Sequence, residues 1–227
     1  MSSPSVKHTL EIDSVNLSFG EREILSGVYL RMETGKVTAL LGSNGSGKSC
    51  LMRILFGELK PQFKSIRLDG KWFDALTSDH VLYLTQYCSI PENITVLKAF
   101  DDFGLDFKDF LAYFPLLAYC RSYRIGELSG GVKRVIETWL ILMSESDFVM
   151  LDEPFSHVTP TDVEIFKTLI LEQKDRKGIL ITDHLWRNVV DISDEMYVLS
   201  DRTVYVARSE EDLVRRGYIR AGEKTSR

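Results

Sequence analysis

Gly42 to Ser49 carry the clearest chemical signal in the chain, because their types and spacing suit the binding of phosphate groups. They read Gly-Ser-Asn-Gly-Ser-Gly-Lys-Ser and fit the pattern G-x-x-x-x-G-K-[ST]. Glycines let successive backbone N–H groups turn toward one anion, and the following helix directs its positive end at the same charge. In this pattern the Lys48 ammonium reaches the β- and γ-phosphates, and the Ser49 hydroxyl binds Mg²⁺. The predicted phosphate-binding residues are Gly42, Ser43, Asn44, Gly45, Ser46, Gly47, Lys48 and Ser49.

The residues on either side of this loop provide the elements that such a loop joins. Val37 to Leu41 form a short apolar run, which is typical of a strand buried on both faces. Leu51, Ile54 and Leu55 follow the loop at helical spacing. Strand, glycine-rich loop and helix therefore occur in the required order.

A second chemical signal lies at the end of another apolar run, Phe148 to Leu151, where Asp152 and Glu153 follow directly. In α/β folds ligands bind at the carboxyl ends of strands. Asp152 is suited to holding Mg²⁺ through its water shell, and Glu153 to orienting a water molecule and accepting its proton. The alternative is a strand that ends in two solvated acids. Beside a phosphate-binding loop, the pair predicts hydrolysis of a nucleoside triphosphate.

Ser129, Gly130 and Gly131 stand at the start of a long predicted helix, whose apolar stripe runs from Val132 to Met143. A serine hydroxyl and unhindered glycine N–H groups at a helix N-terminus can bind an anion. The alternative is an ordinary helix cap. Two phosphate-binding helix ends in one chain suggest that the second serves a nucleotide held by a neighbouring subunit.

The order of predicted elements indicates an α/β fold with a mainly parallel sheet. Apolar and polar residues alternate from His8 to Phe19, and Val28 to Met32 is a second strand near the N-terminus. We expect one domain over residues 1–227, with a core from residues 1–91 and 148–227. Further strands are expected at Ser65–Leu68, Val81–Thr85, Ile179–Thr182, Met196–Leu199 and Val204–Ala207.

Residues 92–147 are expected to form a small inserted helical subdomain, in which Gly104 and Pro115 interrupt short helices. Eight aromatic residues fall within 24 positions of this segment. They either pack the subdomain or form a groove that receives a helix of another protein. These aromatic residues are Phe100, Phe103, Phe107, Phe110, Tyr113, Phe114, Tyr119 and Tyr123.

Composition narrows the class of protein further. The formal net charge is −5, with no evident basic face, which argues against binding to nucleic acid. Three cysteines without metal-ligand spacing, Cys50, Cys88 and Cys120, are typical of reduced thiols in the cytosol. Residues 1–7 carry no apolar signal region, and no apolar run approaches the length that spans a membrane. A role at a membrane would therefore require a partner.

Together these motifs resemble the ATP-binding cassette (ABC) transporter family, and the resemblance covers nearly the whole chain. The loop at residues 42–49 corresponds to the family's Walker A motif, Leu128 to Val132 is similar to its signature motif, and Asp152-Glu153-Pro154 resembles the end of its Walker B strand. The resemblance implies a P-loop NTPase core with N-terminal antiparallel strands. It also implies a stand-alone subunit that hydrolyses ATP with Mg²⁺.

Three single residues take their predicted roles from this resemblance. Gln86 is similar to the glutamine that senses Mg²⁺ and couples to the membrane subunit. His184 resembles the switch histidine that contacts the γ-phosphate, and Phe19 stands where the family places an aromatic residue against adenine. Taken singly, they would be a surface amide, a residue at a helix start and a core aromatic.

The sequence departs from the family pattern at several positions. Val132 replaces the glutamine that commonly ends the signature, and Cys50 replaces a threonine, although its backbone N–H can still bind phosphate. Thr159 replaces an aspartate in the loop after Pro154, which puts communication between two nucleotide sites in doubt. The 42 positions from Gln86 to Leu128 are also few for the family's helical lobe.

The resemblance implies that two such subunits, identical or different, dimerise around two ATP molecules and drive transmembrane transporter subunits. It places the chain in the cytoplasm, on the inner face of the cell membrane through those subunits, and nucleic acid is not an expected partner. Two alternatives are a soluble ABC ATPase acting on ribosomes or DNA, and a regulatory ATP-binding subunit with weak turnover. A nucleotide kinase would share the loop but has no use for Ser129 to Gly131.

Overall fold

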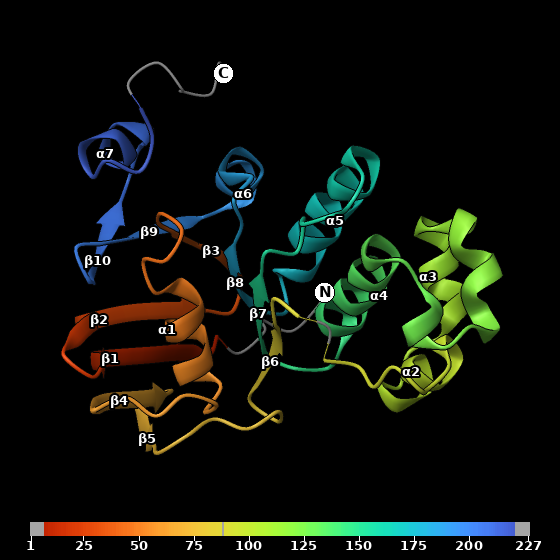
Figure 1. Cartoon of the computed structure of the whole chain (residues 1–227), viewed down its shortest axis with the longest axis horizontal. Helices are drawn as coiled ribbons and strands as arrows, with labels where there is room; N and C mark the ends of the chain where they lie inside the picture. The colour runs from red at the N-terminus through yellow and green to blue at the C-terminus, as the bar shows by residue number, and fades with distance from the viewer. Residues whose placement is uncertain (1–6, 88, 221–227) are drawn as a thin grey trace.

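The computed structural model describes residues 7–87 and 89–220, and it contains two β-sheets and a set of helices (Figure 1). The first sheet is antiparallel, with strand order β2-β1-β4-β5, and the second has the order β10-β9-β3-β8-β7-β6. In the second sheet all neighbouring pairs are parallel except β9 and β10. The strands are β1 Thr9–Phe19, β2 Arg22–Glu33, β3 Lys36–Leu41, β4 Phe63–Leu68, β5 Lys71–Phe73, β6 Val81–Leu84, β7 Phe148–Asp152, β8 Gly178–Thr182, β9 Glu195–Ser200 and β10 Thr203–Ala207.

The helices lie between these strands, except α7, which follows β10, and three α-helices of the described residues lie between β6 and β7. The α-helices are α1 Lys48–Leu55, α2 Val96–Asp102, α3 Phe107–Tyr113, α4 Gly130–Met143, α5 Pro160–Gln173, α6 Trp186–Ile192 and α7 Glu210–Arg215. Two 3₁₀ helices, Pro115–Ser122 and Ile125–Glu127, lie between α3 and α4. The predicted α/β fold with antiparallel N-terminal strands is confirmed. Within the described residues, no helix is both long and apolar enough to cross a membrane.

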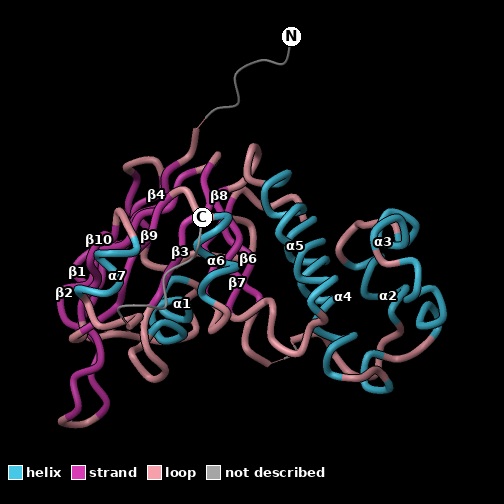
Figure 2. Tube along the Cα trace, turned by 90° about the horizontal axis from the view of Figure 1, so that it is seen from above, coloured by secondary structure: helices cyan, strands magenta, loops and turns pink. Residues whose placement is uncertain are grey.

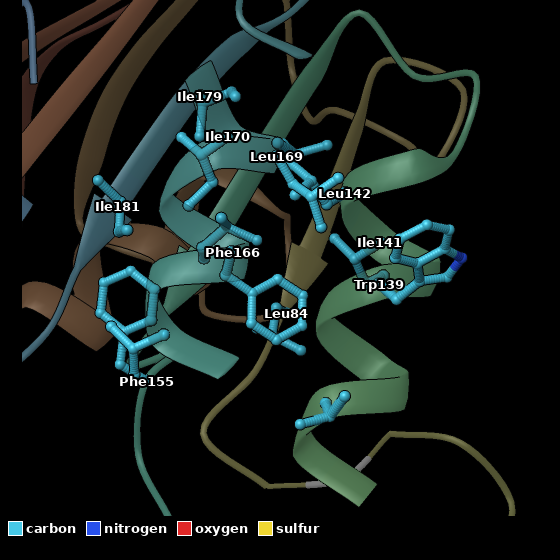
Figure 3. Close-up of a cluster of buried hydrophobic side chains, with 14 of the residues drawn as sticks. Leu84, Trp139, Ile141, Leu142, Phe155, Phe166, Leu169, Ile170, Ile179 and Ile181 are labelled. Carbon is cyan, nitrogen blue, oxygen red and sulfur yellow. The ribbon is translucent and has the colours of Figure 1, made fainter. Parts of the chain in front are cut away.

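Side chains from the two faces of the parallel sheet enter different hydrophobic clusters. Along β3, Ala39 and Leu41 belong to a cluster with α4, α5 and α6, whereas Leu40 belongs to one with α1 and the antiparallel sheet. Such strands have no solvent-facing side, which explains their continuous apolar sequence. Figure 3 shows the first cluster, where Phe155, Phe166 and side chains of α4 meet over β7 and β8.

Two strands differ from what the sequence pattern predicts. Strand β2 begins at Arg22, well before Val28, where the pattern predicted its start. The pattern missed the first part because Gly27, with a φ of 60°, interrupts the alternation of apolar residues within the strand. Strand β5 was not expected, since its three residues are too few to show a period of two. It extends the antiparallel sheet by pairing Ile66 with Phe73.

The aromatic residues between β6 and β7 divide into a packed group and an exposed group. Phe100, Phe107, Phe110 and Phe114 are buried; Phe110 and Phe114 contact Trp139 of α4, and Phe100 and Phe107 contact Phe110. In Figure 2, α2 and α3 lie on the outer side of α4 and α5. Tyr119 and Tyr123 are 58% and 46% exposed, and their rings contact one another. Packing is therefore confirmed for the first group. Cys50 and Cys120 are free thiols, and Cys88 lies outside the described residues.

Candidate active site

The loop between β3 and α1 requires glycine at two of its positions. Gly42 has a φ of 154°, and a Cβ added there would lie 2.7 Å from the carbonyl oxygen of Leu199 and 2.8 Å from Ser46 Oγ. Gly47 has a φ of 112°, and its added Cβ would lie 3.0 Å from Leu25 Cδ2. Larger residues would push the loop away from β9 and β2. The glycines thus fix the backbone that precedes the N-terminus of α1.

Lys48 bends back across this loop. Its Nζ donates to the carbonyl oxygens of Gly42 at 2.7 Å and Ser43 at 3.2 Å. Burial lowers the pKa of Lys48, while the charges of Asp152 and Glu153 act to raise that pKa. A phosphate group would provide the anion that this buried ammonium needs. Within the described residues the buried hydroxyl of Ser46 also has no hydrogen-bond partner, as expected for a loop that binds a ligand.

Asp152, the last residue of β7, lies beside Ser49 of α1, so the loop and the second motif do meet. Burial raises the pKa of the Asp152 carboxyl, and hydrogen bonds from Ser49 and Tyr83 lower that pKa. The Tyr83 hydroxyl donates to Asp152 Oδ2 at 3.0 Å. A hydroxyl and a carboxylate oxygen fit Mg²⁺. No three His, Cys, Asp or Glu side chains of the described chain form a metal cluster, and Mg²⁺ bound with phosphates and water does not need one.

Glu153 has a backbone conformation that is unusual for a residue with a side chain. Its φ is 55°, and its N–H donates to the carbonyl oxygen of Thr182 at 2.7 Å. Its carboxylate Oε2 accepts from Ser156 Oγ at 3.2 Å. Backbone conformations of this kind are common at functional sites, where the surrounding structure holds them. Strand β7 thus ends at Asp152, directly before this turn.

His184 follows β8, whose end lies beside the end of β7 because Thr182 pairs with Asp152. The imidazole is 52% exposed, and its Nδ1 lies 3.3 Å from Asp183 Oδ1. Asp183 is buried and accepts from the backbone N–H groups of Phe155 and Leu185, both at 2.9 Å. Burial raises the pKa of Asp183, and these N–H groups act to lower it. Asp183 thus connects the segments that carry Glu153 and His184.

Helix α4 begins at Gly130, with Ser129 at its N-cap position. Ser129 caps the helix by accepting from the N–H of Val132 at 3.4 Å. A Cβ at Gly131 would lie 2.6 Å from the carbonyl oxygen of His157, so packing within the chain requires glycine there. A Cβ at Gly130 would meet no atom of the described residues within 4 Å. Packing of the chain by itself therefore gives no reason for glycine at position 130.

Phe19 and Gln86 occupy exposed positions near the ends of strands. Phe19 ends β1 and is 54% exposed, which leaves its ring available for a contact with a base. Gln86 is exposed and comes two residues after β6. Cys50 lies in the first turn of α1 and is partly buried. The roles of these residues stay predictions.

Sequence reasoning missed Tyr83, Asp183 and Arg134, which contact predicted site residues from buried positions. Tyr83 gave no signal within a short apolar strand. Arg134 and Glu137 gave no clear signal either, because Lys133 and Thr138 stand beside them and the group looks like the polar side of a helix. Charged residues are rarely buried without a partner.

The comparison with known families decides the identification. The family model described as "ABC transporter" matches residues 25–156, more than half of the chain. The chain belongs to the ABC transporter family. The matched range includes the glycine-rich loop, the signature motif and Glu153.

Relatives in this family are named as ATP-binding proteins of transport systems. The chain is 31% identical over 217 residues to a putative ribose/galactose/methyl galactoside import ATP-binding protein of Pseudomonas syringae pv. tomato, covering 86% of this chain and 41% of the relative. It is 27% identical to the lipopolysaccharide export ATP-binding protein LptB of Haemophilus influenzae, covering 90% of this chain and 92% of that protein. The chain thus spans less than half the length of the sugar-import relative.

Solved structures agree on the fold. The structure titled "Structure of ATP binding subunit of ABC transporter" has a TM-score of 0.75 at 21% identity, covering 93% of this chain and 95% of the other. An ATP-binding cassette in its ADP conformation has a TM-score of 0.71 at 24% identity, covering 91% and 93%. At these identities the likeness concerns the fold alone.

Proposed function

We propose that this ABC-family chain is the ATP-hydrolysing subunit of a transporter and that it works with Mg²⁺. The observation that carries the proposal is the meeting of two motifs about a hundred residues apart in sequence. The carboxylates of Asp152 and Glu153 act to raise the pKa of Lys48, and the Ser49 hydroxyl lies close enough to Asp152 to act on the pKa of that carboxyl. A site that only bound a nucleotide would not need an acid held in the conformation of Glu153.

The loop amides and the Lys48 ammonium would hold the triphosphate, with the backbone N–H of Cys50 at the same helix end. Ser49, Asp152 and Gln86 would hold Mg²⁺. Bound Mg²⁺ would neutralise charge on the phosphate oxygens.

Glu153 would orient the attacking water and accept its proton. His184 would stabilise the negative charge that develops on the γ-phosphate. Phe19 would contact the adenine ring. Each of these three residues lies at or just after the end of a strand, and pairing within the sheet holds the backbone there in place.

The free space above Gly130 supports closure by a second subunit. Ser129, Gly130 and Gly131 would then complete the site around a nucleotide held by that subunit, which can be an identical or a different ABC chain. ATP and ADP would make different contacts across this interface, so hydrolysis would shift the dimer from closed to open.

Exposed aromatic residues offer a contact for transmembrane subunits. Tyr87 is 82% exposed and follows Gln86 directly, and Tyr119 and Tyr123 are exposed in the helical segment. Aromatic residues are enriched in protein interfaces. Such a contact would place the chain in the cytoplasm, on the inner face of the membrane. The relatives are named for both import and export. The transported substrate would be set by the membrane subunits, which contact it.

The proposal is tested by measuring Mg²⁺-dependent phosphate release from ATP, together with the rise in melting temperature that ATP causes. The unaltered chain should show both. Lys48→Ala should lose both, because the loop then lacks the cation that meets the β- and γ-phosphates. Lys108→Ala, which removes an exposed lysine of α3, is the control and should behave like the unaltered chain. Full phosphate release by Lys48→Ala would refute the assigned site.

A further inference from the structure

Arg134 of α4 is a buried cation that contacts the backbone of the candidate active site. Its side chain is only 8% exposed. The guanidinium donates through Nη1 to the carbonyl oxygen of Thr85 at 2.7 Å and through Nε to that of Glu153 at 3.2 Å. A third hydrogen bond runs from Nη2 to the carbonyl oxygen of Asp152. One side chain thus connects the ends of β6 and β7.

These bonds hold Glu153 on both sides. Its N–H donates to Thr182 of β8, and its carbonyl oxygen accepts from Arg134 of α4. The backbone of Glu153 has a φ of 55°, which costs free energy unless neighbouring groups hold it. Arg134 is therefore one of the groups that hold the backbone of Glu153 in this conformation.

Glu137, one turn further along α4, holds the segment that contains Gln86. Its Oε1 accepts from the backbone N–H of Ser89 at 2.6 Å and from Ser89 Oγ at 3.1 Å. Its Oε2 lies 3.9 Å from Arg134 Nη1, so each charge has an opposite charge nearby. Arg134 binds this segment at Thr85 and Glu137 binds it at Ser89, which ties both ends of the stretch around Gln86 to one helix.

A purely structural role would not require these charges. Burying two charges is costly, and apolar residues of similar volume often stabilise a protein more than a buried ion pair does. An arginine is required where a planar group must donate to several acceptors in fixed directions. Here the acceptors are three backbone carbonyl oxygens, two of which belong to the Asp152-Glu153 pair.

We propose that Arg134 is a positioning residue for ATP hydrolysis, which sets the backbone of Glu153 and ties it to the segment carrying Gln86, with Glu137 holding the far end of that segment. The inference rests on the proposed function. The same helix, α4, begins at Ser129 to Gly131. A contact of a second subunit with the start of α4 and the backbone geometry at Glu153 therefore both involve this one helix. Arg134 thereby links the Asp152-Glu153 pair, the segment that carries Gln86 and the helix that begins at the signature motif.

The test compares Arg134→Lys and Arg134→Met with the unaltered chain. Lysine keeps a positive charge beside Glu137 but lacks the planar group that reaches three carbonyl oxygens. We expect kcat to fall about ten-fold or more in both variants, since small displacements of a catalytic group cost this much. The KM for ATP should change less than about three-fold, and the rise in melting temperature on adding ATP should persist, because the phosphate-binding loop is untouched.

Lys167→Met of α5 is the matched control, because Lys167 is also a mostly buried cation and bonds two acids, Glu164 and Asp191, outside the site. Its kcat should stay near that of the unaltered chain. If Arg134→Met does not fold, Arg134→Lys decides alone. A folded Arg134→Lys with unchanged kcat overturns the inference, and so does loss of folding or of ATP binding in both variants. Absence of turnover in the unaltered chain overturns the proposed function as well.

Discussion

At the scale of single residues, Gly130 and Gly131 differ in whether the packing of the chain requires glycine. They are neighbours at the start of α4, yet a side chain at Gly131 would meet His157, whereas one at Gly130 would meet no described atom. The sequence motif treats the two positions alike. Only the structure shows that position 130 has free space, in keeping with a site that receives a group from outside the chain.

Gly130→Asp should fold normally and bind ATP as a monomer, but its ATPase activity should fall about ten-fold or more. An acid in the first turn of a helix is favourable by about 0.3–1 kcal/mol, so stability should not suffer. Activity falls because the carboxylate repels the phosphates of a nucleotide held by a second subunit. Melting curves, ATP titrations and phosphate-release rates measure the three quantities.

Gly130→Ala and Gly131→Ala are the matched controls for this experiment. Alanine at 130 should leave the melting temperature unchanged or slightly raised. Alanine at 131 should lower the free energy of unfolding by about 1–3 kcal/mol, because its Cβ would overlap the carbonyl oxygen of His157. Loss of monomeric ATP binding in Gly130→Asp would contradict a role for this position in a second site.

The residues of the site differ in how far their types and spacing reveal them. Gly42 to Ser49 and Asp152-Glu153 were predictable, since phosphate and metal chemistry restricts residue types within short stretches. Tyr83 and Asp183 were not, because each acts through a contact with a residue distant in sequence or through a backbone group. Such contacts depend on which strands are neighbours, and strand order leaves no local signal.

At the scale of secondary structure elements, the start of α5 explains how the chain tolerates Thr159. The Thr159 side chain accepts from the N–H of Asp162 and donates to the Asp162 carboxylate at 2.7 Å. Threonine thus caps the helix as an aspartate could. The departure from the family pattern removes a charge from this loop but keeps the helix end.

Thr159→Asp should leave the free energy of unfolding nearly unchanged, because aspartate is an equally good cap, although Asp162 adds some repulsion. Thr159→Ala should lower it by about 1 kcal/mol. If the missing acid limits communication between two sites, the aspartate variant should also raise the Hill coefficient for ATP hydrolysis. Urea unfolding and ATPase measurements over a range of ATP concentrations test these outcomes. An equal loss of stability in both variants would contradict the capping role.

The elements themselves were predictable in proportion to their length and pattern. The buried strands β3, β7 and β8 appear as continuous apolar runs, and α4 appears as an apolar stripe, so their positions follow from the sequence. The short edge strand β5 and the start of β2 were not predictable, since three residues or an interrupted alternation show no period. Tertiary pairing determines them.

At the scale of the whole molecule, the parallel sheet brings the loop at Gly42, the acid pair at the end of β7 and His184 after β8 to one edge. Within residues 7–87 and 89–220, Ser129 at the start of α4 bonds to Val132 and Lys48 bonds to Gly42 and Ser43, so no hydrogen bond joins these two groups. The free space at Gly130 fits the proposal that this helix end completes a nucleotide site of a second subunit. We therefore propose that two subunits close around ATP and that hydrolysis, with Glu153 as the base, lets them open again.

Glu153→Gln tests this claim most directly, with Glu172→Gln at an exposed position of α5 as the control. Glutamine can still contact water but cannot accept its proton, so turnover should fall about 100-fold or more. ATP binding should persist. Size-exclusion chromatography with light scattering, in the presence of ATP and Mg²⁺, should then show a stable dimer of the Glu153→Gln variant. A monomer that still binds ATP, or turnover close to that of the unaltered chain, would contradict the account.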